Sequence, residues 1–215
     1  MKKLVKKYDA FSLWKITEMS ELQQVDQFIL HVYYYHHLKE CFYPQQELHD
    51  MIKDDIRALP NSSFYVITDD EEEIVGTIKS ELWDDRKKLP IEKDFRVDLN
   101  QFIQGLSYPP QKVFHIGRFA IDQDKIRKKT ALRKKRLTIL KLLMYYALLP
   151  VMENSSNIFI CECDQKLYSK LNLLGLYPHE IGTSKLCMGS YTVPIYCDNA
   201  GIKDFFTQYN QIEYV

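Results

Sequence analysis

A dense run of basic residues follows a β-strand pattern and leads into an apolar helix. The strand pattern covers residues 113–122, and the basic residues behind it are Lys125, Arg127, Lys128, Lys129, Arg133, Lys134, Lys135 and Arg136. An apolar helix is expected over residues 137–149, ending at Pro150. A helix N-terminus presents free N–H groups and a partial positive charge, and lysine and arginine add full charges. This arrangement is suited to binding a phosphorylated ligand.

The basic run is a local feature, because the whole chain is electrically balanced. The 215 residues contain 29 lysines and arginines and 29 aspartates and glutamates. A nucleic-acid binder that uses the basic run is an alternative, but balanced charge gives it no broad positive field. A steep salt dependence of DNA or RNA affinity would favour that alternative.

The cysteines and histidines do not predict a metal site. The five cysteines are odd in number and form no CxxC motif, which argues against a disulfide framework or structural zinc. Cys161 and Cys163 share one face of a predicted strand, where apolar packing is favoured. The minor alternative is that Cys163 is a nucleophile that accepts the acyl group. His31, His36 and His37 fall on a predicted helix with poor ligand spacing, so we expect surface histidines.

The hydrophobic pattern predicts a mixed order of strands and helices. Strands are expected over residues 8–17, 64–68, 74–83, 113–121, 157–163, 176–181 and 191–196. Helices are expected over residues 22–32, 46–59, 137–149 and 165–174. Asp164 is the expected N-cap and Gly175 the expected stop of the last helix. An acidic turn over residues 69–73 joins two strands into a hairpin.

Residues 84–110 are predicted to be irregular, with one short helix near residues 99–103. So long an irregular stretch inside a compact domain is more often functional than idle. The whole order predicts an α/β (α+β mixed) fold with a mixed sheet and helices on both faces. No linker divides the chain, so one domain over residues 1–215 is expected.

The N-terminus lacks the apolar core of a signal peptide. The longest mostly apolar run, residues 137–152, falls short of the ~20 residues that span a bilayer. A cytoplasmic protein without a membrane span is therefore expected.

Three motifs give the chain a resemblance to the GNAT acyltransferase superfamily over residues 10–197. The strand at 113–121 with its following loop and helix resembles the family's fourth strand and pantetheine-binding helix. YSKLNLLG at 168–175 is similar to the family's YEKLGF signature, with Tyr168 as its tyrosine and two inserted residues, and EIVGTI at 73–78 resembles the start of the third strand. The resemblance implies a central, mostly antiparallel mixed sheet.

The strand HIGRFAI at residues 115–121 resembles the E-x-S-R-F-A-V strand of acyl-homoserine-lactone synthases and long-chain N-acyl amino acid synthases. Arg118, Phe119 and Ala120 match that motif, whereas His115 stands in place of its glutamate and Gly117 in place of its serine. The resemblance implies an acyl donor, either acyl-CoA or acyl-phosphopantetheine on acyl carrier protein. That carrier is acidic, and the basic run would complement it.

The donor-binding loop departs from the superfamily pattern. That pattern, Q/R-x-x-G-x-G/A, uses glycine to bring backbone N–H groups onto a pyrophosphate. Residues 125–132 contain no glycine, so basic side chains would have to supply part of that binding, or the donor differs. We expect the donor to be bound by Phe119, Ala120, Ile121, Arg127, Lys128, Lys129, Thr130 and Arg133.

Direct acyl transfer to a small-molecule amine requires a base for the amine and an acid for the leaving thiolate. His115 is the candidate base, because an imidazole titrates near neutral pH. Tyr168 is the candidate acid, and Arg118 would orient the base, bind an acidic substrate or form a structural ion pair. Glu81 and Glu162 are alternative bases. The backbone N–H groups of residues 119–121 are expected to stabilise the oxyanion, and no metal is expected.

Other readings stay open. A GNAT-fold scaffold that binds a ligand without chemistry would show tight pantetheine binding and no turnover. A long-chain donor needs an apolar tunnel, which the aromatic residues Phe95, Phe102, Tyr108, Phe114 and Phe119 permit. By analogy with the superfamily, the tail at residues 205–215 could pair two copies into a homodimer.

Overall fold

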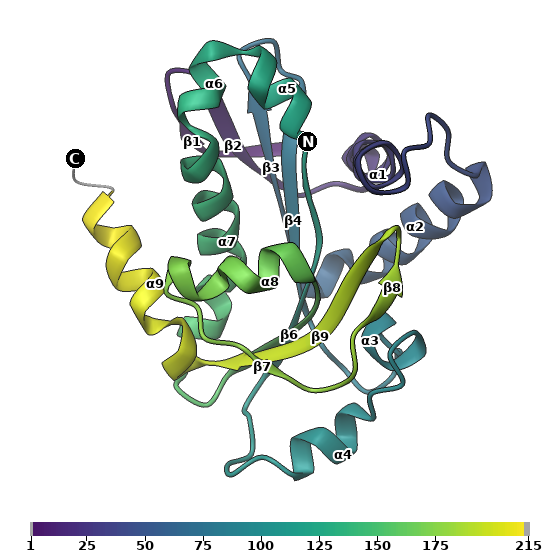
Figure 1. The fold of residues 1–215 in the computed structure, drawn as a ribbon, viewed down its shortest axis with the longest axis vertical. Helices are drawn as coiled ribbons and strands as arrows, with labels where there is room; N and C mark the ends of the chain where they lie inside the picture. Colours follow the sequence, from purple (N-terminus) through teal and green to yellow (C-terminus); the bar gives the residue numbers. More distant parts are fainter. Residues whose placement is uncertain (1, 213–215) are drawn as a thin grey trace. The chain divides into compact units, whose positions relative to one another are not determined.

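The computed structural model describes residues 2–212, with side chains up to residue 209. Figure 1 shows the elements in chain order. They form two compact units, each assembled from two separate stretches of the chain. Unit 1 contains the residues up to 81 together with 117–147, and unit 2 contains 82–116 together with the residues from 148 onward. The expectation of a single domain over residues 1–215 stays a prediction.

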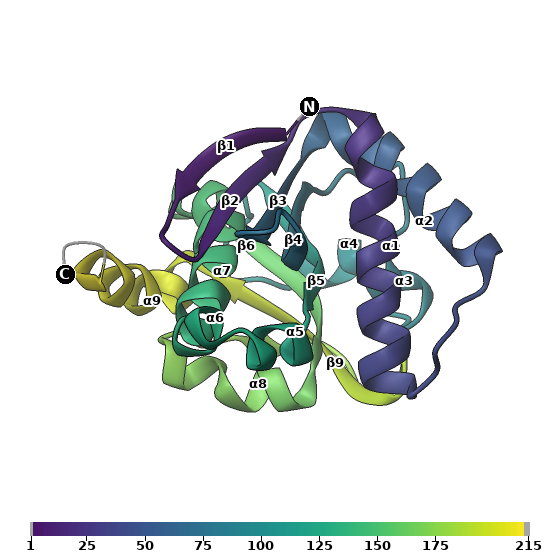
Figure 2. The same ribbon diagram turned by 90° about the horizontal axis from the view of Figure 1, so that it is seen from above.

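Unit 1 contains the antiparallel neighbours β1 (Lys2–Lys7), β2 (Phe11–Ile16), β3 (Ser62–Asp69) and β4 (Ile74–Leu82), followed by the second half of β5 (Val113–Ile121). Its helices are α1 (Leu22–Val32), α2 (Gln45–Ala58), α5 (Gln123–Lys128), α6 (Thr130–Lys134) and most of α7 (Arg136–Met152). Short 3₁₀ turns occupy Met19–Glu21 and Leu59–Asn61, and α1 continues as a π-helix over Tyr33–Leu38. In Figure 2, α1 and α2 lie side by side, and β1 is the outermost strand.

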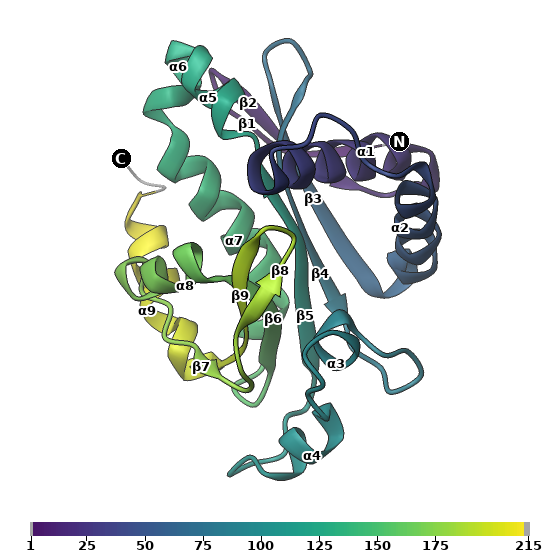
Figure 3. The ribbon, with the colours of Figure 1, turned by 45° about the vertical axis from the view of Figure 1, so that its right-hand side comes forward.

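Helices cover both faces of the unit 1 sheet. Gly76 and Lys79 are three residues apart on β4, so they point to opposite faces. A Cβ at Gly76 would lie 3.0 Å from Cδ1 of Leu143 on α7, while Lys79 binds Asp55 on α2. Figure 3 shows α7 on one side of β3 and β4 and α1 with α2 on the other. The predicted coverage of both faces is confirmed in this unit.

Unit 2 contains the first half of β5, β6 (Ile158–Asp164), β7 (His179–Glu180), β8 (Lys185–Cys187) and β9 (Ser190–Asp198). Strand β6 runs parallel to β5 and antiparallel to β9, and β7 and β8 both pair with β9. The helices are α3 (Pro90–Lys93), α4 (Leu99–Gln104), the end of α7, α8 (Gln165–Leu171) and α9 (Asn199–Ile212), with a 3₁₀ turn at Asn172–Leu174. The strand pairings confirm the predicted mixed, mostly antiparallel sheet.

An apolar cluster fills the space between the unit 2 strands and the segment around α3 and α4. Val113 of β5 and two isoleucines of β6 supply its strand side. The chain before and within α3 and α4 supplies the rest, and the members are Leu89, Ile91, Phe95, Val97, Leu99, Val113, Ile158 and Ile160. The irregular segment at 84–110 is therefore packed onto the sheet of its own unit.

Several local predictions are confirmed. The Asp164 side chain accepts the N–H groups of Lys166 and Leu167 at the start of α8. Gly175 has φ 80°, the left-handed conformation that ends a helix. The short helix near residues 99–103 is α4.

Other local predictions are wrong. Helix α7 does not stop at Pro150 but continues to Met152. Pro150 lies in the last turn, and the Asn157 side chain donates to its carbonyl at 3.0 Å, so a side chain satisfies the backbone there. The strand expected over 176–181 is only the two-residue β7, because only His179 and Glu180 pair with β9.

Strand β1, helix α3, strand β8 and helix α9 were not predicted. The tail considered for dimer formation starts at Phe205 within α9, where the structure has a helix, and residues 213–215 lie outside the described residues. No helix within residues 2–212 combines the length and apolar character that crossing a membrane requires.

Candidate active site

Strand β5 carries both His115 and Arg118, three residues apart. Arg118 has φ 53°, a left-handed conformation that is strained for any residue other than glycine. Such strain persists only where the surrounding structure holds it, and it often marks functional positions. The parallel pairing of β5 with β6 covers only Val113, Phe114 and His115.

In unit 1, a buried network of charges holds Arg118. Its Nε donates to Oδ2 of Asp55 at 2.7 Å and its Nη2 to Oδ1 at 3.2 Å, a two-pronged ion pair. Lys79 donates to the same Asp55 at 3.0 Å and to Glu81 at 2.7 Å. Asp55 is completely buried, and Asp26 lies beside it, also completely buried. The positive charges of Lys79 and Arg118 therefore balance the negative charges of Asp55 and Glu81 without a contribution from Asp26.

Within the network, Asp55 is charged and its neighbour Asp26 is neutral. Burial and the neighbouring Asp55 raise the pKa of Asp26 to about 8. Burial also acts to raise the pKa of Asp55, but the charges of Arg118 and Lys79 outweigh it and hold that pKa below its ordinary value. Neither oxygen of Asp26 accepts a hydrogen bond. A hydrogen bond between Asp26 and Asp55 is nevertheless one cause of the raised pKa of Asp26. A protonated Asp26 that donates to the Asp55 carboxylate accounts for both observations.

Sequence reasoning missed Asp26, Asp55 and Lys79. A signal was present, because Asp26 lies among the apolar residues of α1, and Asp55 continues the spacing of Leu48 and Met51 on α2. A polar residue on an apolar helix face requires a buried partner. The role of Arg118 toward a substrate stays a prediction, and its observed partner is Asp55.

The predicted oxyanion segment forms the second half of β5 in unit 1. Ala120 is buried and Ile121 nearly so. The Phe119 carbonyl accepts the hydroxyl of Tyr33, at the start of the π-helix, at 3.2 Å, and the Arg118 carbonyl accepts Oγ1 of Thr77 at 2.8 Å. The backbone of this segment is therefore fixed from two directions, as an oxyanion site requires, and the role itself stays a prediction.

The basic run folds as two short helices, where a loop was expected. Asp122 caps α5 by accepting the N–H groups of Asp124 and Lys125. The aspartate ahead of the basic run, and not only the apolar pattern behind it, determines where the helical structure begins.

Acidic residues of the β3–β4 turn neutralise part of the basic run. Lys129 lies 2.8 Å from Asp69 and 2.9 Å from Glu71, and hydrogen bonds to these two carboxylates raise its pKa. Lys125 lies 2.9 Å from Glu73. The three carboxylates could together hold a cation, but two lysines already occupy their oxygens.

The other predicted donor-binding side chains are exposed. Lys128, Thr130 and Arg133 are solvent-exposed, and Arg127 lies 3.4 Å from Asp124. Lys128 and Arg133 are therefore better placed to meet an anionic ligand than Lys129.

In unit 2, the candidate base and one of its alternatives form a pair. Nε2 of His115 lies 2.9 Å from Oε2 of Glu162 and 3.3 Å from Oε1. His115 is 4% exposed, and its Nδ1 is buried without a hydrogen-bond partner. Burial acts to raise the pKa of Glu162, but His115 and the backbone of Ile91 outweigh it and lower that pKa. Glu162 is therefore a carboxylate at neutral pH. The other alternative base, Glu81, binds Lys79 in unit 1.

The candidate acid Tyr168 lies on α8 and is partly buried. Burial and a hydrogen bond to Glu180 raise the pKa of its phenol, so the phenol is protonated at neutral pH, as an acid must be. Cys163 is a poor candidate nucleophile, because its thiol is buried and donates to the backbone carbonyl of Asp164.

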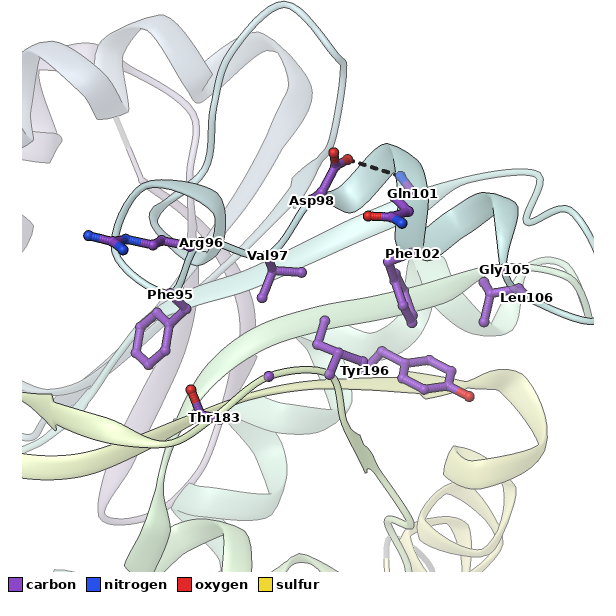
Figure 4. A pocket seen from close by; sticks show the side chains of 12 residues that line it. Phe95, Arg96, Val97, Asp98, Gln101, Phe102, Gly105, Leu106, Thr183 and Tyr196 are labelled. Atoms are coloured by element: carbon purple, nitrogen blue, oxygen red, sulfur yellow. Dashed lines mark hydrogen bonds between the residues drawn. The ribbon is translucent and has the colours of Figure 1, made fainter.

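A hollow of about 680 Å³ lies within unit 2 (Figure 4). One wall comes from residues 95–106 and the other from residues 181–183 with Tyr196 of β9. Its apolar surface consists of Phe95, Val97, Phe102, Leu106, Ile181 and the ring of Tyr196, and Phe102 and Tyr196 stack edge to face at 5.0 Å. All six residues belong to, or pack against, the apolar cluster that includes Val113. Phe95 and Phe102 were among the aromatic residues considered for an apolar tunnel.

Comparisons with known proteins agree with this fold. A protein-family model described as N-acyl amino acid synthase FeeM matches residues 29–169. The structure of FeeM, an N-acyl amino acid synthase from uncultured soil microbes, has a TM-score of 0.59 at 15% identity, covering 88% of this chain and 91% of that chain.

Two further structures of related function share the fold. A CoA-dependent acyl-homoserine lactone synthase, BjaI, solved with SAM and isopentyl-CoA, has a TM-score of 0.58 at 13% identity, covering 93% of this chain and 88% of that chain. The acyl-homoserine lactone synthase LasI has a TM-score of 0.50 at 10% identity, covering 96% of each chain. A search of curated proteins found no match.

Proposed function

This chain belongs to the N-acyl amino acid synthase FeeM family, and on that premise we propose that it joins a long acyl chain to the amino group of an amino acid. It is an N-acyltransferase with the GNAT fold, and its reaction is acyl transfer to an amine. The observation that carries the proposal is the family match over residues 29–169, which include His115, Glu162 and Tyr168. The donor we propose is a pantetheine thioester, on CoA or on acyl carrier protein.

In the proposed reaction the amine nitrogen attacks the thioester carbonyl. The new C–N bond forms, the C–S bond breaks, His115 takes a proton from the amine and Tyr168 gives a proton to the leaving thiolate. His115 is suited to this role because it has a buried nitrogen without a partner. Tyr168 is suited because its phenol remains protonated.

We propose that the unit 2 hollow receives the acyl chain. Its volume of about 680 Å³ falls within the roughly 300–1,000 Å³ of small-molecule pockets. Its apolar residues are continuous with the cluster that contains Val113, two residues before His115 on the same face of β5. An acyl chain there would replace water against aromatic and aliphatic side chains.

Gly105 offers a way to shorten the hollow without straining the backbone. It lines the hollow at φ −81°, and an added Cβ would come no closer than 3.4 Å to a neighbouring atom. We expect Gly105→Phe to fill part of the hollow and shift the preferred donor to shorter chains. Each methylene excluded from apolar burial loses about 0.8 kcal/mol, or about fourfold in kcat/KM.

The measurement is kcat/KM for donors of increasing acyl length. Gln104→Phe is the matched control, because it adds the same ring at the neighbouring exposed position, which does not line the hollow. An unchanged length preference in Gly105→Phe would remove the hollow from the acyl site. A thermal-shift titration with acetyl-CoA, long-chain acyl-CoA and long-chain acyl carrier protein then identifies the donor. Stabilisation by acetyl-CoA alone would overturn the long-chain assignment.

A further inference from the structure

We infer that Glu162 is a positioning residue, which orients His115 so that Nδ1 of the imidazole is the proton acceptor of the reaction. This inference rests on the proposed function. The motif that β5 resembles has a glutamate at the position of His115. Here a histidine on β5 pairs with a glutamate on the neighbouring β6.

Strand register brings the two side chains together. His115 pairs with Ile160 across the parallel strands β5 and β6. Glu162 lies two residues further along β6, so its side chain projects from the same face as that of Ile160. The register therefore places both side chains on one face of neighbouring strands, where Nε2 and Oε2 lie 2.9 Å apart.

The carboxylate determines which imidazole nitrogen carries the hydrogen. An ionised glutamate only accepts hydrogen bonds, so Nε2 of His115 must be the donor. In the neutral ring, Nδ1 then has a free lone pair. That atom is buried and has no hydrogen-bond partner among the described residues. Buried polar atoms are nearly always paired, so an unpaired acceptor suggests a group that arrives with the substrate.

The same contact stabilises the protonated state that the reaction forms. When Nδ1 takes the amine proton, the ring becomes an imidazolium beside the Glu162 carboxylate, and the ion pair lowers the energy of that intermediate state. The proton comes from the attacking amine as the C–N bond forms and the C–S bond breaks. It is later released to solvent, which restores the neutral ring.

Two thiols that interact with Glu162 have raised pKa values and are neutral. Cys161 lies on the same strand as Glu162, and its pKa is raised by Cys163 and by burial. Cys187 on β8 has a pKa raised by burial and by the charges of Asp94 and Glu162, which outweigh the opposing Lys185. The carboxylate of Glu162 is thus the anion in direct contact with His115.

The first test compares Glu162→Gln with Glu162→Asp and wild type. We expect Glu162→Gln to lower kcat at least 10-fold with little change in KM, and to move the acid limb of the pH–rate profile to lower pH. That shift follows because an imidazolium without its carboxylate loses its proton more readily. Glu162→Asp should recover part of both effects. Glu153→Gln, at an exposed position in the same unit, is the control and should match wild type.

A double variant at positions 115 and 162 tests whether the two side chains act as one pair. His115→Glu alone sets two carboxylates against each other, and such a pair cannot be ionised together. We expect the double variant His115→Glu with Glu162→Gln to be more active than His115→Glu alone. A Glu162→Gln profile with an unmoved acid limb would overturn the role of Glu162.

A spectroscopic measurement keeps the inference testable without activity. The ¹⁵N chemical shifts of the His115 ring in wild type should show protonated Nε2 and unprotonated Nδ1 at neutral pH. The reverse tautomer would overturn the inference even in an active enzyme. A wild type that transfers no acyl group from any donor, but shows the expected tautomer, would instead count against the proposed function.

Discussion

Replacement of Asp26 by asparagine is expected to stabilise the protein at neutral pH and to destabilise it near pH 4. Asp26 is completely buried, and its pKa is raised from 3.8 to about 8. Between roughly pH 4 and pH 8 the folded protein therefore holds a proton that the unfolded chain releases. Folding stability falls as pH rises through this window, because the folded state binds more protons.

The size of the effect follows from the pKa difference. At pH 7 the pH lies about three units above the unfolded pKa, and each unit corresponds to ~1.4 kcal/mol, so the ceiling is about 4 kcal/mol. Asparagine has the shape of the protonated acid and can also donate to Asp55, but an amide donates a weaker hydrogen bond than a carboxylic acid does to a carboxylate. We therefore expect Asp26→Asn to gain about half the ceiling, ~2 kcal/mol.

Urea unfolding at pH 5, 7 and 8.5 tests this expectation. The free energy of unfolding of wild type should fall across this range relative to that of Asp26→Asn. The pKa values of Asp55 and Glu162 are lowered, so both groups stay ionised at all three pH values and do not contribute to the difference. Asp54→Asn is the matched control, because Asp54 lies on the same helix as Asp55, its side chain is 43% exposed, and it lies 4.0 Å from Arg57.

A destabilisation by Asp26→Asn of equal size at all three pH values would refute the reasoning. It would mean that Asp26 is ionised in the folded protein, with Arg118 or Lys79 as its counter-charge.

Three further predictions concern the site and the fold. Tyr168→Phe should lower kcat about 10²-fold or more without changing the unfolding midpoint, and an unchanged kcat would remove the phenol from the mechanism. Lys128→Glu combined with Arg133→Glu should weaken donor binding about 10-fold at low salt and less at high salt. Equal donor affinities of the variant and wild type in a binding titration would mean that the donor binds elsewhere. Gly175→Ala should lower the free energy of unfolding, measured in urea, by more than ~1 kcal/mol. The reason is that Gly175 has φ 80° and that the new Cβ would lie 2.8 Å from the backbone nitrogen of Phe205. A smaller loss would mean that the α9 backbone can move aside.

Elements with strong local signals could be predicted from the sequence. The strand at 113–121 agrees with β5, and the aspartate cap and glycine stop of α8 are both observed. These features depend on neighbouring residues alone, so a single sequence contains them. The family resemblance drawn from the same residues is confirmed by the family match.

Elements without such a signal were missed for different reasons. Strand β1 reads KKLVKK and lacks alternation, and it is stabilised by pairing with β2 and by Lys2 lying over the Trp14 ring at 4.8 Å. For α9 the signal was present, because Ile202, Phe205 and Tyr209 follow helical spacing and are buried.

The key pairings of the site come from register and packing between distant segments. His115 and Glu162 meet because β5 and β6 pair in one register, and Asp55 meets Arg118 because α2 packs on the sheet of unit 1. The sequence therefore indicated which side chains could do chemistry, but not which would be partners.

The discontinuous make-up of both units has a consequence for biosynthesis. Unit 1 requires residues up to 147, and unit 2 takes its second part from residue 148 onward. A ribosome-bound chain that ends before residue 118 holds Asp55 without its arginine partner, and one that ends before β9 lacks the strand that pairs with β6. Because chains grow at about 5–20 residues per second, roughly 3–13 seconds pass between the synthesis of Asp55 and that of Arg118. The parts of unit 1 made before residue 117 therefore remain without their second stretch for several seconds of synthesis.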